Sequence, residues 1–506
     1  MAPDETPRSE TESKTPAAAP AAQPAAPPAW RGWALFAAAL VGTFVLGLLA
    51  ASIISRRIEA ERQPPREPID AMETDSSRWA VNYPREYNRY RMTATTGTKT
   101  KYGGSYQWDY LEQTPANVIL FAGYPFSKAY LQARGHQHDV EDVAATERIS
   151  AKSPATCWTC KSPDVLREMV AFGPATSIQD LGQEQVAKFY ALPFDHFRGQ
   201  KDASGGFVHE QGKITHPIGC LDCHEPSTMR LTITRPALRE AFQRRGMDLS
   251  KVSHQEMRSL VCAQCHVEYY FRTDKEQGLV NYLTFPWKEG TQIEKIETYY
   301  EGVGFSDWTH AISKAPMLKM QHPDYEIYLT GVHAARNVSC ADCHMPYRTE
   351  GGVKFTDHFI QSPLLNIENS CAVCHRWSED DLRQRVEGIQ DKVREARDRT
   401  ERVLAQAHLD IRAAMDHKAT EDELKPLRKL VRGSQMRWDF VAANNGMGFH
   451  SPQECMRVLQ ASLDLAAQAR VEAARVLARH GYTNPVAYPD YTTKAKAIEA
   501  IQPYLK

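Results

Sequence analysis

The chain has 506 residues, of which 42% are hydrophobic, and its formal net charge is −1. This length is enough for one large core or several smaller ones. The lack of a basic surplus excludes ordinary nucleic-acid binding, because there is no excess positive charge to displace phosphate counterions.

The N-terminus combines a low-complexity segment with an apolar stretch. Residues 1–29 are mostly Ala and Pro, a composition that cannot form a packed core, so we predict disorder over residues 1–32. The uncharged stretch 33–54 would span about 33 Å as a helix, which exceeds the roughly 30 Å bilayer core. Cleaved signal peptides have shorter apolar cores. We therefore predict a retained transmembrane signal anchor, with cleavage after Ala50 or Ala51 as the alternative.

Residues 55–78 contain three prolines and are predicted to be a polar tether. The following region, residues 79–376, is rich in Pro, Gly and aromatic residues and contains five Cys-x-x-Cys motifs. Four motifs are followed by histidine, namely His224, His266, His344 and His375. The first motif, Cys157-Trp-Thr-Cys160, is followed by Lys161.

The Cys-x-x-Cys-His pattern is typical of c-type haem attachment, in which two thiols bind one porphyrin and the histidine binds its iron. The predicted attachment residues are Cys157, Cys160, Cys220, Cys223, Cys262, Cys265, Cys340, Cys343, Cys371 and Cys374. Zinc knuckles are the alternative. Two zinc sites would use eight of these ten cysteines and leave one pair over, and zinc does not explain the four histidines. Disulfides between such close cysteines would be strained.

Covalent haem attachment implies export from the cytoplasm. The eleventh cysteine, Cys455, lies on a predicted helix, and we expect it to be a buried, inert thiol. The porphyrins would supply core volume to the catalytic region, which therefore needs only short helices around the motifs.

Counting iron ligands predicts one unusual haem. Four bis-histidine irons need four more histidines, and 14 of the 18 histidines lie outside the motifs. Spacing alone does not choose among them. A deprotonated Lys161 amine could bind the fifth iron, and the motif supplies no sixth ligand, so an open, substrate-binding iron is expected. In the alternative, Lys161 points to solvent and another residue binds that iron.

Residues 377–506 are predicted to form long helices. Ser378 and Asp381 form a capping-box start. Apolar residues then recur at helical spacing, namely Leu382, Val386, Ile389, Val393, Ala396, Val403 and Ala407. A second helix is predicted from about Gln453 to a stop at Gly481. The apolar stripes predict a homodimer interface, and packing within the chain is the simpler alternative. The predicted fold is mainly α, with an irregular haem-packed body and long C-terminal helices.

These motifs resemble those of pentahaem cytochrome c nitrite reductase, the ammonia-forming enzyme. The resemblance runs from about residue 79 to the C-terminus. It rests on Cys157-Trp-Thr-Cys160-Lys161, on Cys262-Ala-Gln-Cys265-His266-Val-Glu268-Tyr269-Tyr-Phe and on Lys319-Met-Gln321-His322-Pro. Shorter matching stretches are Ala122-Gly-Tyr-Pro-Phe126, Arg134-Gly-His136, Phe305-Ser-Asp-Trp308-Thr and Thr356-Asp-His358.

The resemblance implies a role for individual residues. Lys161 would be the proximal ligand of the active haem. The axial histidine pairs would be His224 with His358, His266 with His136, His344 with His450, and His375 with His333, and His138 ranks second to His136. The distal side of the active haem would be lined by Arg148, Tyr269 and His322, with Arg134 as the fallback for Arg148. One calcium ion would be bound by Glu268, Gln321 and the backbone carbonyls of Tyr269 and Lys319.

These residue types suit a small anion. Arg148 offers cationic donors to nitrite, His322 can transfer protons, and Tyr269 can donate a hydrogen bond. Calcium prefers oxygen ligands. The resemblance thus implies five covalently bound haems, one Ca²⁺ and six-electron reduction of nitrite to ammonium, with nitric oxide and hydroxylamine as further substrates.

The predicted setting is the periplasmic face of the inner membrane, with a quinol-oxidising membrane multihaem cytochrome as electron donor. Two alternatives remain open from the sequence. One is a related reductase for hydroxylamine or sulfur oxyanions. The other is a multihaem electron carrier in which every iron is saturated and no substrate turns over.

Overall fold

The computed structural model describes residues 29–62, 67–203 and 205–505. It divides into two units, Met1–Pro64 and Pro65–Lys506. Most of the predicted disordered segment, residues 1–28, lies outside the described residues. In the first unit, helix α1 (Ala29–Arg62) begins before the predicted span and continues beyond it.

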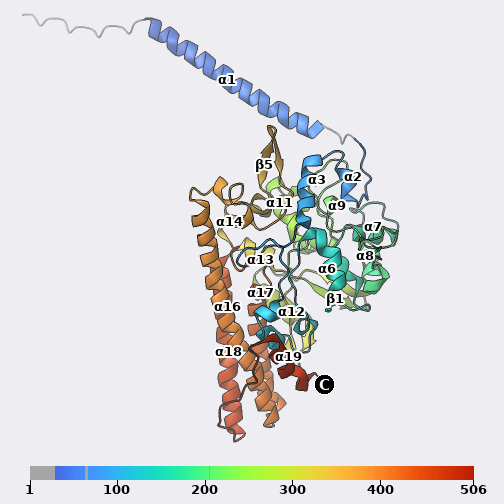
Figure 1. Ribbon diagram of the computed structural model, residues 1–506, viewed down its shortest axis with the longest axis vertical. Coiled ribbons are helices and arrows are strands. Elements are labelled where there is room, and N and C mark those ends of the chain that lie inside the picture. The colour runs from blue at the N-terminus through green and yellow to red at the C-terminus, as the bar shows by residue number, and fades with distance from the viewer. Residues whose placement is uncertain (1–28, 63–66, 204, 506) are drawn as a thin grey trace, which may run out of the picture. The chain divides into compact units, whose positions relative to one another are not determined.

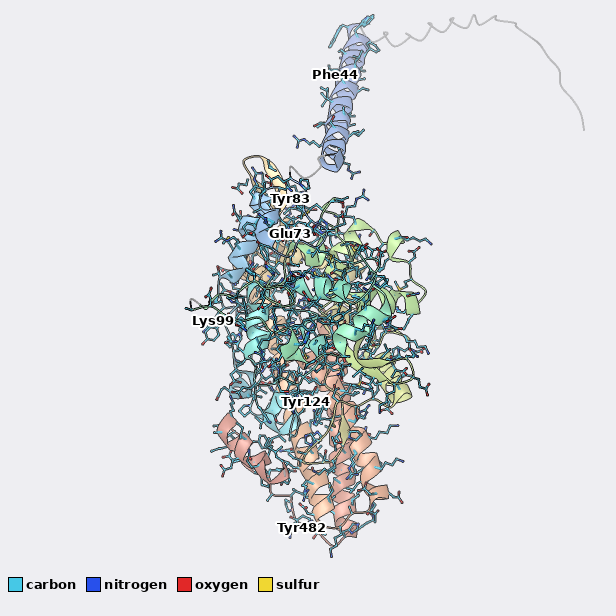
Figure 2. All side chains as sticks on the ribbon, turned by 90° about the vertical axis from the view of Figure 1, so that its right-hand side faces the viewer. Phe44, Glu73, Tyr83, Lys99, Tyr124 and Tyr482 are labelled. Carbon is cyan, nitrogen blue, oxygen red and sulfur yellow. The ribbon has the colours of Figure 1, made fainter. Side chains whose placement is uncertain are left out.

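Helix α1 carries the apolar stretch on all its sides, as Phe44 and its neighbours show in Figure 2. Its segment Trp30–Arg57 has a mean hydropathy of 2.3 and is long and apolar enough to cross a membrane. A signal sequence near the N-terminus would have the same properties.

The second unit is mainly helical, which confirms the predicted class. Its α-helices before residue 377 are short: α2 (Ser76–Trp79), α3 (Pro84–Arg91), α4 (Tyr110–Gln113), α5 (Ala116–Leu120), α6 (Asp139–Ala145), α7 (Asp164–Ala171), α8 (Gln183–Tyr190), α9 (Cys220–Cys223), α10 (Pro236–Arg244), α11 (His254–Ala263), α12 (Ile293–Val303), α13 (Asp324–Leu329), α14 (Val332–Ala335) and α15 (Cys340–His344). Short 3-10 turns separate many of them, including η4 (Ala155–Trp158) and η8 (Cys371–Val373).

Three small antiparallel hairpins, which we did not predict, complete this part of the chain. They are β1 (Tyr270–Asp274) with β2 (Leu279–Thr284), β3 (Trp308–Thr309) with β4 (Pro316–Met317), and β5 (Tyr347–Glu350) with β6 (Val353–Thr356). The β1–β2 register pairs Tyr270 with Thr284, so Glu268 and Tyr269 lie immediately before a fixed strand.

Ordered structure begins before the predicted start of the catalytic region at residue 79. Asp75 caps α2 by accepting a hydrogen bond from the Ser77 amide. At the end of this turn Trp79 is buried and packs in a small cluster with Leu221. The end of the predicted tether is therefore part of the catalytic unit.

Four helices form the C-terminal region: α16 (Glu379–Asp416), α17 (Glu421–Ala442), α18 (Pro452–Arg479) and α19 (Lys494–Ile501). Ser378 caps α16 as predicted, with its hydroxyl accepting from the Asp381 amide. We did not predict α17, although Thr420 and Glu423 form a capping box at its start.

Helices α16, α17 and α18 run beside one another (Figure 1), and α18 packs against both α16 and α17. Tyr482, just beyond α18, lies at the far end of this bundle (Figure 2). The apolar stripes of α16 and α18 are thus used, at least in part, within the chain. Cys455 is fully buried on α18, as expected for a thiol that serves packing.

Candidate active site

Each Cys-x-x-Cys motif lies in or at the end of a single helical turn. The turns are η4, α9, the end of α11, α15 and η8. One helical turn brings residues three apart onto one side, so the two thiols of a motif and the following side chain can meet one cofactor. The first turn is fixed by Trp158, which stacks on Phe194 at 4.0 Å between ring centroids and donates to its carbonyl at 3.0 Å.

The structure brings together all four histidine pairs that the resemblance implies. The ring centroids of His224 and His358 lie 6.1 Å apart, and the centroids of the other three pairs lie 6.3 Å apart, namely His136 with His266, His333 with His375, and His344 with His450. Two imidazoles bound to one metal through bonds of about 2.0 Å, with ring centres about 1.1 Å beyond the nitrogens, would have centroids about 6.2 Å apart. The spacing fits one iron between the rings of each pair.

In three of these rings, a hydrogen bond between Nδ1 and a backbone carbonyl orients the imidazole. The Nδ1 atoms of His224, His344 and His358 lie 2.8–3.0 Å from the carbonyls of Met229, Gln361 and Thr356, respectively. An Nδ1–H that donates to a carbonyl leaves Nε2 unprotonated, which is the arrangement found at metal-bound histidines.

The competing candidate His138 does not face His266. Its Nε2 lies 3.0 Å from the Ala94 carbonyl and its Nδ1 lies 3.6 Å from Glu141. Gly135, with φ of 110°, precedes His136 in a backbone conformation that favours glycine. This turn directs His136, rather than His138, toward the motif histidine.

The motif cysteines also lie close to one another. The thiols of Cys160 and Cys265 are near enough to perturb each other's pKa, and so are those of Cys262 and Cys340. None of the described cysteines forms a disulfide. The first, third and fourth motifs are therefore neighbours.

Lys161 faces the interior beside the first motif. Its Nζ lies 3.8 Å from Asp139, whose carboxylate is almost fully buried. Burial acts to lower the pKa of Lys161, but Asp139 and the Cys160 and Cys265 thiols raise it above its usual range. Binding to iron would release this proton, because a ligand amine must be neutral. The Lys161 side chain is 27% exposed, and its role as an iron ligand stays a prediction.

Arg148 is the arginine that remains available for an anion. Its guanidinium lies 4.5 Å from the Phe126 ring centroid and 5.8 Å from that of Tyr130, and it donates to the Ala129 carbonyl at 3.3 Å. Within the described part of the chain it forms no ion pair. The fallback Arg134 is instead held by Glu141 and Asp142, at 2.8 and 2.6 Å.

Electrostatic interactions place Tyr269 and His322 around the same motif. Burial and the Cys160 and Cys157 thiols raise the pKa of Tyr269 well above its usual range. Burial and the positive charge of Lys161 lower the pKa of His322 to about 3. His322 nevertheless keeps accessible surface. The pKa shift partly depends on the Lys161 charge, which coordination would remove.

The predicted calcium residues meet beside this site. Glu268 is fully buried, and its carboxylate accepts from the Gln321 amide at 2.6 Å and from the Tyr300 hydroxyl at 2.7 Å. Burial, followed by repulsion from Glu326 and Asp307, raises its pKa well above the usual range. A buried carboxylate among other acids fits a bound cation.

Gln321 could complete such a site. Its side-chain nitrogen donates to the Lys319 carbonyl at 3.2 Å, and rotation of the amide would present its oxygen instead. No cluster of three or more His, Cys, Asp or Glu side chains suited to a metal occurs among the described residues. The predicted set needs only one carboxylate, with amide and carbonyl oxygens as the other ligands.

Two acidic residues hold the loop Lys319–His322, namely Asp307, which lies in a matching stretch, and Asp439, which lies in none of the quoted motifs. Asp439, on α17, binds the Lys319 ammonium at 2.9 Å and the Met320 amide at 2.8 Å. Asp307 accepts from the Lys319 amide at 2.8 Å. No local pattern marks Asp439, because it is 117 or more residues away from the loop that it contacts.

Comparison with known proteins identifies relatives along nearly the whole chain. The family model described as cytochrome c552 matches residues 75–506. The cytochrome c-552 of Parabacteroides distasonis is 49% identical over 482 residues, covering 94% of this chain and 92% of that protein. That of Porphyromonas gingivalis is 48% identical over 483 residues, covering 94% and 91%.

A solved structure is also similar to this chain. The catalytic subunit of cytochrome c nitrite reductase from Desulfovibrio desulfuricans, described with two calcium sites, is 32% identical and superposes with a TM-score of 0.72, covering 80% of this chain and 87% of that one. The resemblance drawn from the motifs is confirmed. This chain belongs to the cytochrome c552 family.

Proposed function

We propose that this protein is an ammonia-forming cytochrome c nitrite reductase. The observation that carries the proposal is the combination of four histidine pairs at iron-binding spacing with one motif in which Lys161 takes the place of the histidine. The family membership and the nitrite reductase from Desulfovibrio desulfuricans support it. When bound, the haem irons supply electron transfer and a coordination position for nitrite.

The ten motif cysteines and the nine axial residues would hold five haems. Lys161 would bind the active iron from one side and leave the opposite side to substrate. Arg148, which lacks a carboxylate partner, would bind nitrite oxygens and favour the anion electrostatically. Tyr269 would donate a hydrogen bond to oxygen or nitrogen of the bound substrate.

His322 would pass protons to the substrate as the N–O bonds break. The overall conversion consumes six electrons and eight protons and yields ammonium and two waters, so repeated proton delivery at one position is required. The accessible surface of His322 would allow re-protonation from water between steps. The buried Asp139 beside Lys161 would accept the hydrogen bonds of the lysine and hold its side chain in place.

Calcium would bind at Glu268 and Gln321 with the carbonyls of Tyr269 and Lys319. Its charge would compensate the buried carboxylate and fix the loop that carries His322. The repulsion among Glu268, Glu326 and Asp307 supports a cation at this position.

The four bis-histidine haems would deliver electrons from a membrane-bound, quinol-oxidising multihaem cytochrome. Trp79, in α2, packs beside the motif Cys220–Cys223. The apolar α1 would remain as an anchor, with the catalytic unit in the periplasm.

Two copies of the chain would pair through the C-terminal helices, and exposed apolar side chains on α18, such as Met456 and Val471, are available for this contact. Sedimentation of the detergent-solubilised protein tests the pairing. A single-copy mass at micromolar concentration would exclude it.

The decisive experiment is a steady-state assay of the purified, haem-loaded protein with a reduced viologen donor. We expect one ammonium for each nitrite consumed. Adding nitrite or cyanide should also shift a high-spin haem signal. A fully loaded protein without such a signal and without turnover would be an electron carrier, and our proposal would be wrong.

A further inference from the structure

In three of the motifs, the residue before the second cysteine contacts the same buried dipeptide. Thr159, Asp222 and Gln264 occupy this position in the first, second and third motifs, and each is at least 98% buried. All three contact the dipeptide Thr234–Arg235, which lies immediately before α10 and is itself fully buried.

Arg235 connects the lysine motif to the second motif. Its Nε donates to the Thr159 carbonyl at 2.7 Å, and a terminal nitrogen donates to the Ser162 carbonyl at 3.1 Å. These two carbonyls bracket Cys160 and Lys161. The same terminal nitrogen binds the Asp222 carboxylate, whose other oxygen accepts from the Gly219 amide at 2.7 Å.

The backbone of the dipeptide Thr234–Arg235 connects the third motif as well. The Gln264 side-chain oxygen accepts from the amides of Thr234 and Arg235, at 3.0 and 3.1 Å. Its nitrogen donates to the Asp222 carbonyl at 2.8 Å, and the Thr234 hydroxyl donates to the same carbonyl at 2.9 Å. The hydrogen bonds of Thr234 and Arg235 to Thr159, Asp222 and Gln264 therefore join the dipeptide to three motifs.

We propose that Thr234–Arg235 is a hub that sets the relative positions of three haems, the lysine-bound haem and its two neighbours, and that Arg235 is thereby a positioning residue for electron delivery to the active iron. The proposal rests on the proposed haem content. A planar guanidinium with donors in a fixed fork can hold three acceptors at fixed angles, which a lysine ammonium on a flexible stem cannot do. The hub acts on geometry and does not contact substrate.

The chain offers a matched control at the fourth motif. There Asp342 occupies the equivalent position and pairs at 3.1 Å with Arg258, which is 95% buried. This pair also joins an arginine to a motif aspartate, but Arg258 has no bond to the lysine motif among the described contacts. Substitution of Arg258 should therefore affect the haem of His344 and leave the lysine-bound haem unchanged.

The test uses the haem-loaded full chain in detergent, with Arg235→Met, Arg235→Lys and Arg258→Met. Haem content is counted by mass. The magnetic interaction between the lysine-bound iron and its neighbour is followed by electron paramagnetic resonance, and re-reduction of the lysine-bound haem is followed by rapid mixing. We expect five haems in Arg235→Met, an altered interaction signal and re-reduction slowed by about tenfold or more, since small displacements have large rate effects. Arg235→Lys should be intermediate.

The hub proposal is wrong if Arg235→Met keeps the wild-type interaction signal and re-reduction rate, or if Arg258→Met alters them equally. Should Arg235→Met fail to load haem, Thr234→Val removes one hub hydroxyl with little change in shape. A smaller change of the same kind supports the hub, and a wild-type signal and rate overturn it. These readouts do not depend on nitrite turnover, so failure of the proposed reaction would appear separately, as absence of ammonium in the wild type.

Discussion

Neutralising Asp439 tests how the loop that carries His322 is held. The Lys319 ammonium and the Asp439 carboxylate are each only 1% exposed and lie 2.9 Å apart. In Asp439→Asn the ammonium keeps the Met320 carbonyl and the Phe126 ring, whose centroid is 4.9 Å away, but it loses its buried counter-charge. The substitution preserves shape, so its effect reports on the charge.

The expected magnitude follows from the burial of both partners. Removing one member of a buried ion pair costs about 3–5 kcal/mol. For the unit Pro65–Lys506, an unfolding entropy of about 2.1 cal/mol/K per residue gives about 0.9 kcal/mol/K in total. The melting temperature of Asp439→Asn should therefore fall by about 3–5 °C.

Calcium provides the more specific measurement. A ligand at a hundred times its Kd stabilises by about 2.7 kcal/mol, which here corresponds to about 3 °C, and tenfold weaker binding removes about half of that. We expect Asp439→Asn to bind calcium about tenfold more weakly, because the Lys319 carbonyl and Gln321 are no longer held in register. Melting temperatures of the haem-loaded protein, recorded in excess calcium and in chelator, measure both effects.

Asp410→Asn is the matched control. Asp410 is a buried aspartate of α16 that binds Arg470 at 2.8 Å and Tyr488 at 2.6 Å, and neither partner belongs to the proposed calcium site. This variant should lower the melting temperature but keep the full calcium-dependent increment. A melting temperature for Asp439→Asn within about 1 °C of wild type, well short of the roughly 3 °C expected from the loss of a buried ion pair, together with an unchanged calcium increment, would refute the reasoning.

Three further predictions concern the proposed iron ligand Lys161, the proposed anion-binding residue Arg148 and the dependence of stability on pH. Lys161→His should retain five haems by mass but lower ammonium production with a viologen donor by about tenfold or more, because the proximal ligand tunes the iron; unchanged rates would show that the amine is not needed. Arg148→Lys should raise KM for nitrite by about tenfold through loss of paired donors, whereas Arg134→Lys, at an arginine already bound by two carboxylates, should change KM little; equal effects would contradict the assignment. Burial lowers the pKa of His408 from 6.5 to about 4, so the unfolded chain binds a proton that the folded chain does not, and stability present above pH 6.5 should decline by about 3 kcal/mol as pH falls to 4. His408→Gln should flatten the dependence of melting temperature on pH over this window, and an unaltered slope would mean that the buried imidazole is not responsible.

Much of the chemistry could be predicted from short segments. Cysteine spacing and the next residue specify haem attachment and the first iron ligand, because these bonds are made within five consecutive residues. The start of α16 at Ser378 followed from a cap that acts over three residues. Helix α17 was missed although Thr420 and Glu423 supply the same kind of signal, because Pro426 within the helix and its polar first turns mask the apolar pattern.

The predicted second histidine of each of the four histidine pairs was named by family resemblance and not by any local pattern. His136 and His138 are two residues apart, and the neighbouring residues do not distinguish them. In the structure, the turn at Gly135 directs one toward His266 and leaves the other at the Ala94 carbonyl. The neighbouring residues likewise do not distinguish Arg134 from Arg148. Only the folded structure shows that Arg134 is already paired with Glu141 and Asp142.

The sequence by itself determined the cysteine motifs, the lysine in place of one histidine, the apolar N-terminal helix and the family. Tertiary structure decided which histidines face each other, which arginine stays unpaired, and how Asp439 and Arg235 hold the loop and the motifs. The physical reason is the distance along the chain between the residues that interact. Attachment, capping and hydrophobic span depend on residues within a few turns of one another. In contrast, the histidine pairs join residues from 42 to 134 positions apart, and Lys319 pairs with Asp439 120 positions away, so only the packed chain brings them together.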